Sequence, residues 1–421
     1  MTFVITILIG CSEDKPSPEP PPSEPPVQPE LPSEYDVTVT VEVPGTLSSQ
    51  MPSSSFKTIK IEGELNGADI RYLRGIISSL TKIDLEDASI VSGGVPYYST
   101  YQTEDGIIGE YMFSNIGGEF EIILPKNAIR IEKSAFEGST GLIGIELPQV
   151  SYIGVNAFYQ CKNLKGITIP ESVTKIDAQA FYKCESLSNI TLGSNIIEIG
   201  TSCFFECSSL AAIALPDKLT EIPASFLDGT AIEQIVIPSA TETIGKGAFQ
   251  RCTKLEKIIL GENVKEIDPW AFNLSENIKE VMISESNPFI TIDAGIIYTK
   301  DFKEIVLNVT SKVSELDIKD GIQRIRKEAF RNASPEKLTL PASLMEIEQS
   351  AFSYAVKEVH CKGVKPPKIS WTVAIGPGHY AGVYAFQQAT QTHASLFIPT
   401  GTTDQYVMAG YRVCFETITE E

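Results

Sequence analysis

A phenylalanine recurs along most of this 421-residue chain at a spacing of 22 or 23 residues. The regular series comprises Phe113, Phe136, Phe158, Phe181, Phe204, Phe226, Phe249 and Phe272, and the spacing resumes at Phe330 and Phe352 after an insertion. Each unit continues with a pattern close to L-x-x-I-x-I-P, as in "LKGITIP" at 164–170. Apolar residues that alternate with a period of two are typical of a strand with one buried face. A unit of this length cannot bury that face alone, so the repeat predicts stacked coils whose strands form a long parallel sheet.

The predicted fold class is therefore a β-rich repeat solenoid of the leucine-rich-repeat type, with one parallel strand per 22–23-residue unit and few short helices, preceded by a disordered stalk. Residues 35–43 alternate strictly and predict a strand that covers the N-terminal edge, and "NGADIRYLRGIISSL" at 66–80 predicts a helix. Residues 284–312 predict a hairpin that projects from the array, and 362–395 an irregular loop. The predicted segments are 1–10 signal-peptide remnant, 11–34 lipidated cysteine and Pro-rich linker, 35–119 N-terminal cap and first irregular repeats, 120–283 regular repeats, 284–312 inserted β-hairpin, 313–361 further repeats, and 362–421 C-terminal loop and cap.

The N-terminus carries features of a secreted, lipidated protein. The apolar "MTFVITILIG" is too short to span a bilayer and is similar to the end of a signal peptide, so we expect a start upstream of Met1. The word "LIGC" resembles a lipobox, which implies cleavage before Cys11 and lipidation of that cysteine. A Pro-rich tract follows at once and predicts an extended tether. Ser12-Glu13-Asp14 resembles an acidic export signal of surface lipoproteins, with ordinary linker acidity as the alternative.

Several longer sequence segments resemble those of the BspA-like leucine-rich-repeat proteins. They are "AFYQC", "AFYKC", "GITIPESVTKID", the insert "NPFITIDAGIIYTKDFKEIVL" and the ending "LFIPTGTTDQYVMAGYRVCFETI". The resemblance covers roughly residues 36–421 and implies a surface-anchored module for adhesion or protein interaction, without a catalytic motif. With the lipobox, it predicts an outer-membrane lipoprotein that is exposed at the cell surface and binds an extracellular or host protein.

The net charge of −20 argues against several function classes. Such an acidic surface repels nucleic acids and anionic lipids. We therefore expect no nucleic-acid partner, and we expect the chain to attach to a membrane only through the lipid on Cys11. The three histidines, His360, His379 and His393, stand outside metal-binding or catalytic motifs. We therefore expect no enzyme activity, no catalytic residue, no cofactor and no metal; an irregularly assembled active site is the weakest of three hypotheses.

Four cysteines stand three residues after a repeat phenylalanine: Cys161, Cys184, Cys207 and Cys252. Equivalent positions hold Ser139, Gly229, Ser275, Ala333 and Ala355, which indicates a small buried residue rather than a metal ladder. A disulfide between neighbouring coils, such as Cys161 with Cys184, remains open on spacing. Cys361 and Cys414 could also pair within the C-terminal cap.

The repeat register predicts which side chains point outward from the long sheet. One outward column is polar at Glu146, Thr168 and Thr191 but apolar from Ala214 through Val236 and Ile259 to Met282. With Ala212 from the adjoining column, these residues form the candidate binding face: Ala212, Ala214, Val236, Ile259 and Met282. The alternative is that such residues merely suit a sheet, or that the 284–312 insert covers them.

A glycan-binding accessory protein is the second hypothesis. Its candidate contacts are the aromatic residues Tyr97, Tyr98 and Tyr101 in "GGVPYYSTYQTEDG". The alternative is that these tyrosines pack the long 86–119 connection.

Overall fold

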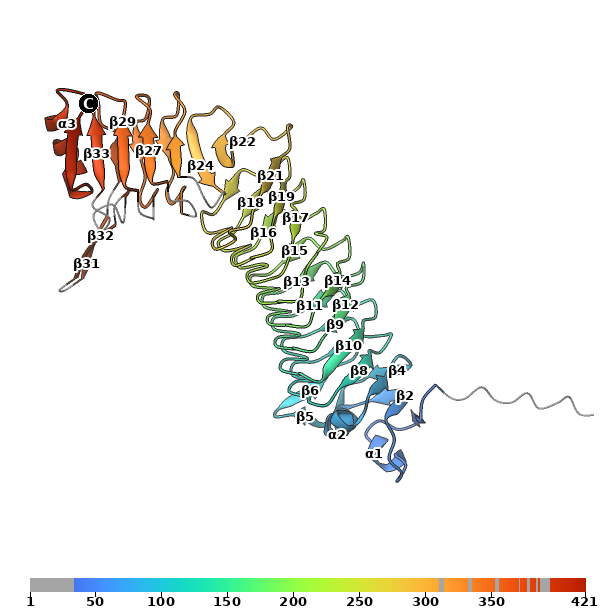
Figure 1. Cartoon of the computed structure of the whole chain (residues 1–421). Coiled ribbons are helices and arrows are strands. Elements are labelled where there is room, and N and C mark those ends of the chain that lie inside the picture. Colours follow the sequence, from blue (N-terminus) through green and yellow to red (C-terminus); the bar gives the residue numbers. More distant parts are fainter. Residues whose placement is uncertain are drawn as a thin grey trace, which may run out of the picture. The chain divides into compact units, whose positions relative to one another are not determined.

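The computed structural model describes residues 34–309, 314–331, 335–352, 356–370, 372–376, 379–383, 385–386 and 394–421, with backbone only at 372–376 and 379–383. Cys11, Ser12-Glu13-Asp14 and the Pro-rich tract lie outside these residues, as do Ala333 and Ala355. Residues Tyr35–Glu421 form one compact unit. Within it the predicted solenoid is confirmed, because successive coils stack with their strands in parallel files (Figure 1).

Most regular coils contain two strands and a turn segment that bears the repeat phenylalanine. The first strand lies in the I-x-I stretch and contributes to what we call the first-strand sheet. In the regular repeats and the N-terminal coils its members are β1 (Val37–Val41), β2 (Thr58–Leu65), β3 (Lys82–Asp84), β8 (Phe120–Ile123), β10 (Leu142–Glu146), β12 (Gly166–Thr168), β14 (Asn189–Thr191), β17 (Gln234–Val236), β19 (Lys257–Leu260) and β21 (Glu280–Ile283). After the insert the members are β25 (Glu315–Asp317), β27 (Lys337–Leu340), β29 (Glu358–Cys361), β33 (Ser395–Ile398) and β34 (Thr417–Glu420).

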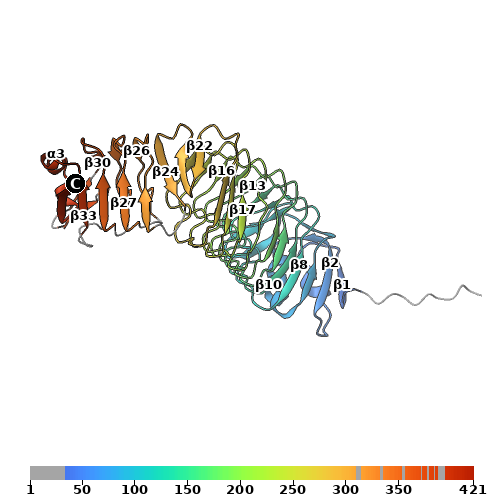
Figure 2. The same cartoon turned by 45° about the horizontal axis from the view of Figure 1, so that its top comes forward.

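A second, shorter strand follows in each coil and forms the second-strand sheet, which the sequence pattern did not predict as a separate sheet. Its members are β7 (Ile107–Ile108), β9 (Arg130–Ile131), β11 (Tyr152–Ile153), β13 (Lys175–Ile176), β15 (Glu198–Ile199), β16 (Glu221–Ile222), β18 (Thr243–Ile244), β20 (Glu266–Ile267), β26 (Arg324–Ile325), β28 (Glu346–Ile347) and β30 (Lys368–Ile369). Each buries one apolar side chain, such as Ile153 or Ile176, at the coil interior. Figure 2 shows the first-strand file from β1 and β2 to β10 and, past the insert, β27 and β33.

Stacked phenylalanine rings fill the coil on its third side. The rings of Phe136, Phe158 and Phe181 are fully buried, and their centroids lie 5.1 Å apart with planes within 10° of parallel. The turn backbone is also paired between coils, since the N–H of Phe136 donates to the carbonyl of Ala157 at 2.8 Å. Stacking of the coils therefore both pairs the backbone N–H and C=O groups of the turn and buries its phenylalanine ring.

The N-terminal coils confirm two expectations. Strand β1 pairs in parallel with β2 and forms the edge of the sheet. Helix α2 (Gly67–Ile76) lies in the predicted helical stretch and begins with a capping box between Asn66 and Asp69. The remaining elements before residue 105 are α1 (Leu47–Gln50), the 3₁₀ turn η1 (Ile77–Ser79), β4 (Ala88–Ile90), β5 (Gly93–Tyr98) and β6 (Tyr101–Thr103).

The insert at 284–312 does not project from the array, contrary to expectation. It forms β22 (Ile290–Asp293), β23 (Ile296–Thr299) and β24 (Glu304–Asn308), which pair antiparallel in that order. Strand β24 then pairs in parallel with β26, so the insert extends the second-strand sheet. Because it joins that sheet, its pairing does not place it over the candidate binding face on β17, β19 and β21.

Both strand ladders are interrupted at one place, which we call the seam, between the coil of β14 and β15 and the next coil. Among the described residues, 211–215 form no strand, and β15 pairs with β13 but not with β16. Pro223 stands where neighbouring coils have Gly200 and Gly245, whose N–H groups donate across the ladder at 2.8 Å. Proline has no N–H to donate. The turn side stays paired, with the N–H of Ser202 donating to the carbonyl of Ala224 at 2.9 Å.

The C-terminal region is more regular than predicted. Strands β31 (Thr372–Gly376) and β32 (His379–Val383) form an antiparallel hairpin in the stretch expected to be an irregular loop. The array ends with α3 (Thr403–Met408) and the 3₁₀ turn η3 (Tyr411–Val413). Tyr406 and Tyr411 are fully buried there, and their hydroxyls donate to the carbonyls of Gly363 and Pro367.

Candidate binding face

The predicted apolar residues lie together on the outer side of the first-strand sheet. Val236 is the register partner of Ile259, and Ile259 is the partner of Met282, on β17, β19 and β21. Ala212 and Ala214 lie one coil earlier, at the seam. We call Ala212, Ala214, Val236, Ile259 and Met282 the apolar stripe.

The apolar stripe is exposed to solvent. Val236 is 53% exposed and Met282 46%, Ile259 is half-buried, and both alanines are exposed. Their neighbours along each strand, Ile235 and Ile258, are buried, as alternation requires. The stripe therefore adds nothing to the coil interior, and burying it would take a partner surface.

Paired charges border the stripe on the side where β19 and β21 begin. Lys257 and Glu280 are register partners, and their charged atoms lie 3.0 Å apart. Lys279 and Glu256, one position further out, form an ion pair of 2.6 Å. The two charges within each exposed pair neutralise each other, and such pairs contribute little to the stability of the fold.

Unpaired carboxylates border the stripe on the side where each strand ends. Asp217, Glu262 and Glu285 are exposed and stand three residues after Ala214, Ile259 and Met282. Within the described part of the chain, none of the three carboxylates has a hydrogen bond or ion pair. We call these three residues the acidic rim.

A shallow depression precedes the stripe on the same sheet. It has a volume of about 700 Å³ and is lined by β10, β12 and β14, with Glu146, Thr168 and Thr191 among its residues. Gly166 forms part of its floor, where an added side chain would press against Asn189. The sequence column had marked Glu146, Thr168 and Thr191 as outward and polar, but not the depression between them.

The three candidate glycan contacts divide into one buried and two accessible tyrosines. Tyr97 is only 3% exposed, and its hydroxyl donates to the carbonyl of Glu110 at 2.8 Å, so its prediction as a surface contact is wrong. Tyr98 is 39% exposed and Tyr101 is half-buried; both are close to Tyr111, a residue that the sequence did not single out. The guanidinium of Arg74 lies 4.6 Å from the ring centre of Tyr98 and covers one of its faces.

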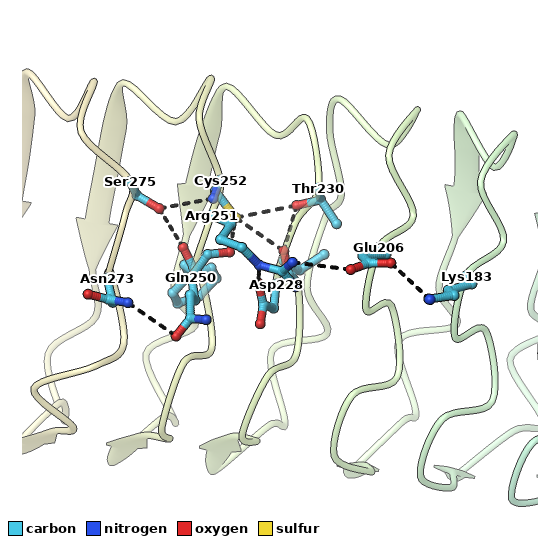
Figure 3. A network of polar contacts seen from close by, with 11 residues as sticks. Lys183, Glu206, Asp228, Thr230, Gln250, Arg251, Cys252, Asn273 and Ser275 are labelled. Atoms are coloured by element: carbon cyan, nitrogen blue, oxygen red, sulfur yellow. Dashed lines mark hydrogen bonds and ion pairs between the residues drawn. The ribbon is translucent and has the colours of Figure 1, made fainter.

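A polar network spans several coils on the turn side (Figure 3). The Nε of Arg251 donates to Asp228 at 2.7 Å and its Nη1 to Glu206 at 3.1 Å, while Lys183 pairs with the other oxygen of Glu206 at 3.3 Å. Asp228 is only 4% exposed, and burial raises its carboxyl pKa above the ordinary value although Arg251 opposes this. Because each of these residues faces a neighbouring coil rather than a pocket, the network holds coils together next to the seam.

The four repeat cysteines are buried free thiols, as expected. Each thiol donates to a main-chain carbonyl of the preceding coil, as Cys161 does to Phe136 at 3.1 Å and Cys184 to Phe158 at 3.2 Å. The hydroxyl of Ser275 does the same toward Phe249 at 2.7 Å, and that of Ser139 toward Phe113. In the coils that hold cysteine or serine, the position therefore supplies a small hydrogen-bond donor, which the serines at equivalent positions could have revealed. Cys203, Cys361 and Cys414 are also free and buried.

The described residues also bear on metal ligands, membrane-spanning helices and the histidines. They contain no group of three or more His, Cys, Asp or Glu side chains that could hold a metal ion. Their helices include none that is long and apolar enough to cross a membrane. His360 stacks on Phe397 at 4.4 Å and hydrogen-bonds Glu421 at 2.8 Å, whereas His393 and the side chain of His379 are outside the described structure.

Comparison with known proteins gives a family and several solved structures to which this chain is similar. The family model of the BspA type leucine rich repeat region, with six copies, matches residues 106–228, 175–294 and 297–362, which is more than half of the chain. A leucine rich cell surface protein from Faecalibacterium prausnitzii A2-165 is 21% identical over 81% of this chain and 87% of its own, with a TM-score of 0.48. A leucine-rich repeat protein from Bacteroides ovatus ATCC 8483 is 20% identical over 91% and 92%, with a TM-score of 0.46. The pneumococcal vaccine antigen PcpA is 17% identical over 81% and 89%, with a TM-score of 0.39. No curated protein is found to match the chain.

Proposed function

Because this chain belongs to the family of proteins built on BspA type leucine-rich repeats, we propose that it is a non-catalytic protein-binding module that works in adhesion at the cell surface. The apolar stripe on β17, β19 and β21 is the observation that supports this function. It places exposed Val236 and Met282 beside Ile259 on three strands that pair with one another. Apolar side chains in that position gain by burial against a partner protein.

Attachment through a lipid on Cys11 is part of the same proposal. The "LIGC" word and the Pro-rich tract after it support an outer-membrane lipoprotein whose repeat unit, Tyr35–Glu421, is carried away from the membrane. Metabolic labelling with a fatty-acid analogue tests this directly, with Cys11→Ser as the variant that should lose the label. Protease treatment of intact cells then reports whether the repeat unit faces outward; full protection there would contradict surface display.

Binding through the apolar stripe is tested with arrays of extracellular-matrix proteins. We expect at least one protein to bind the wild-type chain and to bind Ile259→Asp about tenfold or more weakly, because a charge in a buried contact is costly. Thr168→Asp is the matched control, since it adds the same charge to the same outward column at a polar position. Equal binding by wild type and Ile259→Asp would remove the stripe from the proposal.

Glycan binding is the alternative that one observation favours. Tyr98, Tyr101 and Tyr111 gather their rings within 6.5 Å of one another at the surface of the N-terminal coils. Polysaccharide arrays test it with the double change Tyr98→Ala and Tyr101→Ala, and with Tyr159→Ala, at a half-buried tyrosine of a distant coil, as control. A polysaccharide hit lost only in the double variant would favour glycan recognition over protein adhesion.

A further inference from the structure

The charges around the apolar stripe are unequal on its two sides. Where β19 and β21 begin, Lys257 and Lys279 neutralise Glu280 and Glu256 in ion pairs of 3.0 and 2.6 Å. Before β17, the exposed Glu233 is the carboxylate on this side without an ion pair among the described residues. Where the strands end, the three carboxylates of the acidic rim are exposed and have no partner among the described residues. Two lysines lie beside the rim, but neither forms an ion pair with a rim carboxylate among the described residues: Lys218 donates its ammonium to Asn195 at 2.8 Å, and Lys300 donates to the main-chain carbonyl of Glu285 at 3.3 Å.

A partner that covers the stripe must also meet these carboxylates. Burying an unpaired carboxylate against an apolar or acidic surface is unfavourable, whereas lysine or arginine on the partner would supply the missing cation. The net charge of −20 acts in the same direction, because it attracts a basic partner at long range and repels an acidic one.

We propose that the stripe and the acidic rim together recognise a protein segment in which apolar side chains are bordered by lysine or arginine. This inference rests on the proposed function and adds the chemistry of the partner to it. The stripe supplies the contact area, and the rim selects among apolar partners by charge. The rim runs across the coils beside the stripe, at Asp217, Glu262 and Glu285, so the cations of the partner must repeat along one side of its apolar row.

Three synthetic peptides test the partner chemistry on the full chain. Each has 12 residues and alternates valine with lysine, with serine or with glutamate, so that only the charge differs. We expect the lysine peptide to bind about tenfold more tightly than the serine peptide at low salt and the glutamate peptide to bind more weakly still. The preference should shrink in 0.5 M salt, where exposed charges are screened within a few ångströms.

Chain variants separate the stripe from general charge attraction. Val236→Asp makes the chain more acidic, so weaker binding of the lysine peptide by this variant would locate the contact at the stripe. Glu262→Lys with Glu285→Lys should weaken it about tenfold, whereas Glu42→Lys with Glu119→Lys, at exposed carboxylates of the N-terminal coils, should weaken it less than twofold. Thermal unfolding of each variant shows whether it is folded.

The outcomes distinguish this inference from the proposed function beneath it. Equal loss in the two charge-reversal pairs, or equal binding of the serine and lysine peptides, would overturn the inference and leave protein binding through the stripe standing. Lysine-peptide binding that Val236→Asp leaves unchanged, or no binding by any peptide, would overturn the inference as well. The matrix-protein arrays with Ile259→Asp then decide separately whether the stripe binds protein.

Discussion

At the residue scale, the position three residues after the repeat phenylalanine links sequence to packing. Cys161, Cys184 and Cys207 fill it with a thiol that donates to the phenylalanine carbonyl of the coil before. In the coil of Phe226 that position is Gly229, which has no side-chain donor, and the hydroxyl of the next residue, Thr230, donates within the same coil to Leu227 at 2.8 Å. Small size is common to all residues at this position, and the cysteines and serines among them add a hydrogen-bond donor.

Cys161→Ser should therefore be tolerated better than Cys161→Val. Serine keeps the donor and should cost less than about 1 kcal/mol, whereas valine removes the donor and adds volume in a packed interior, which costs about 1–3 kcal/mol. Thermal unfolding of the two variants gives the comparison. A lower melting temperature for the serine variant than for the valine variant would show that the position selects apolar volume, not a donor.

Arg251 is the residue of the turn-side network whose loss should cost most. Arg251→Met leaves Asp228 buried without its cation, and because Arg251 is itself part-exposed we expect a loss of about 1–3 kcal/mol. The double variant Arg251→Met with Asp228→Asn should recover most of this lost stability. Lys279→Met, which breaks the exposed pair with Glu256, is the control and should change stability by less than about 0.5 kcal/mol.

The pH dependence of the Arg251→Met effect follows from the Asp228 carboxyl. The pKa of this carboxyl is raised in the folded chain. The folded chain therefore favours the protonated, neutral form of Asp228, and stability falls as rising pH ionises the buried carboxyl. Removing Arg251 raises that pKa further, and the destabilisation should be larger at pH 7 than at pH 4. An equal loss at both values would mean that Asp228 is not the group left unpaired.

At the scale of the elements, the seam is a place where the ladders of both sheets are interrupted between the same two coils. Residues 211–215 make no strand, and Pro223 removes a donor from the second-strand sheet. The turn side remains paired, so the coils stay joined while both sheets are interrupted. Regions with fewer backbone hydrogen bonds open at lower free energy than those around them.

Hydrogen exchange should reveal the seam in the free protein. We expect the amides of residues 212–214 to exchange at least about tenfold faster than those of Lys257–Leu260, which sit inside a paired three-stranded sheet. Pro223→Ala restores the missing N–H and should slow exchange of neighbouring amides. Uniform protection across both stretches would contradict an interruption at this point.

Much of this element structure was accessible from the sequence, and the exceptions have physical reasons. The 22–23-residue spacing and the I-x-I alternation predicted the coil, the parallel sheet and the outward column with Val236 and Met282. The insert was misjudged because its hairpin pattern does not show that β24 pairs with β26. Tyr97 was misjudged because its burial depends on how β5 and β6 fold against Glu110, a contact set by tertiary packing.

At the scale of the whole molecule, buried groups that titrate in alkali make stability depend on pH. Burial raises the pKa of Cys207 and Cys361 from 9.0 to about 12, and that of Tyr298 from 10.0 to about 12. These groups are neutral in the folded chain. Their contribution to stability is complete below the pKa that they have in the unfolded chain, and it is lost as the pH rises toward the pKa that they have in the folded chain.

We therefore expect the melting temperature to stay level from pH 7 to about 8.5 and to fall from about pH 9 to 12. Each buried thiol adds a slope of up to about 1.4 kcal/mol per pH unit in that window. Cys207→Ser removes one such group and should flatten the slope. A fall of the same steepness in wild type and Cys207→Ser would show that other groups dominate the alkaline loss.

The central claim is that the outer side of the first-strand sheet is the contact surface of the molecule, and two methionines test it within one chain. Met282 belongs to the stripe and is 46% exposed, whereas Met345 lies next to β28 of the second-strand sheet and is 66% exposed. Brief oxidation by hydroxyl radicals, followed by mass spectrometry, measures the accessibility of both with and without the matrix protein identified on the arrays. We predict that the bound partner protects Met282 severalfold and leaves Met345 unchanged; protection of Met345 with Met282 still fully oxidised would contradict it.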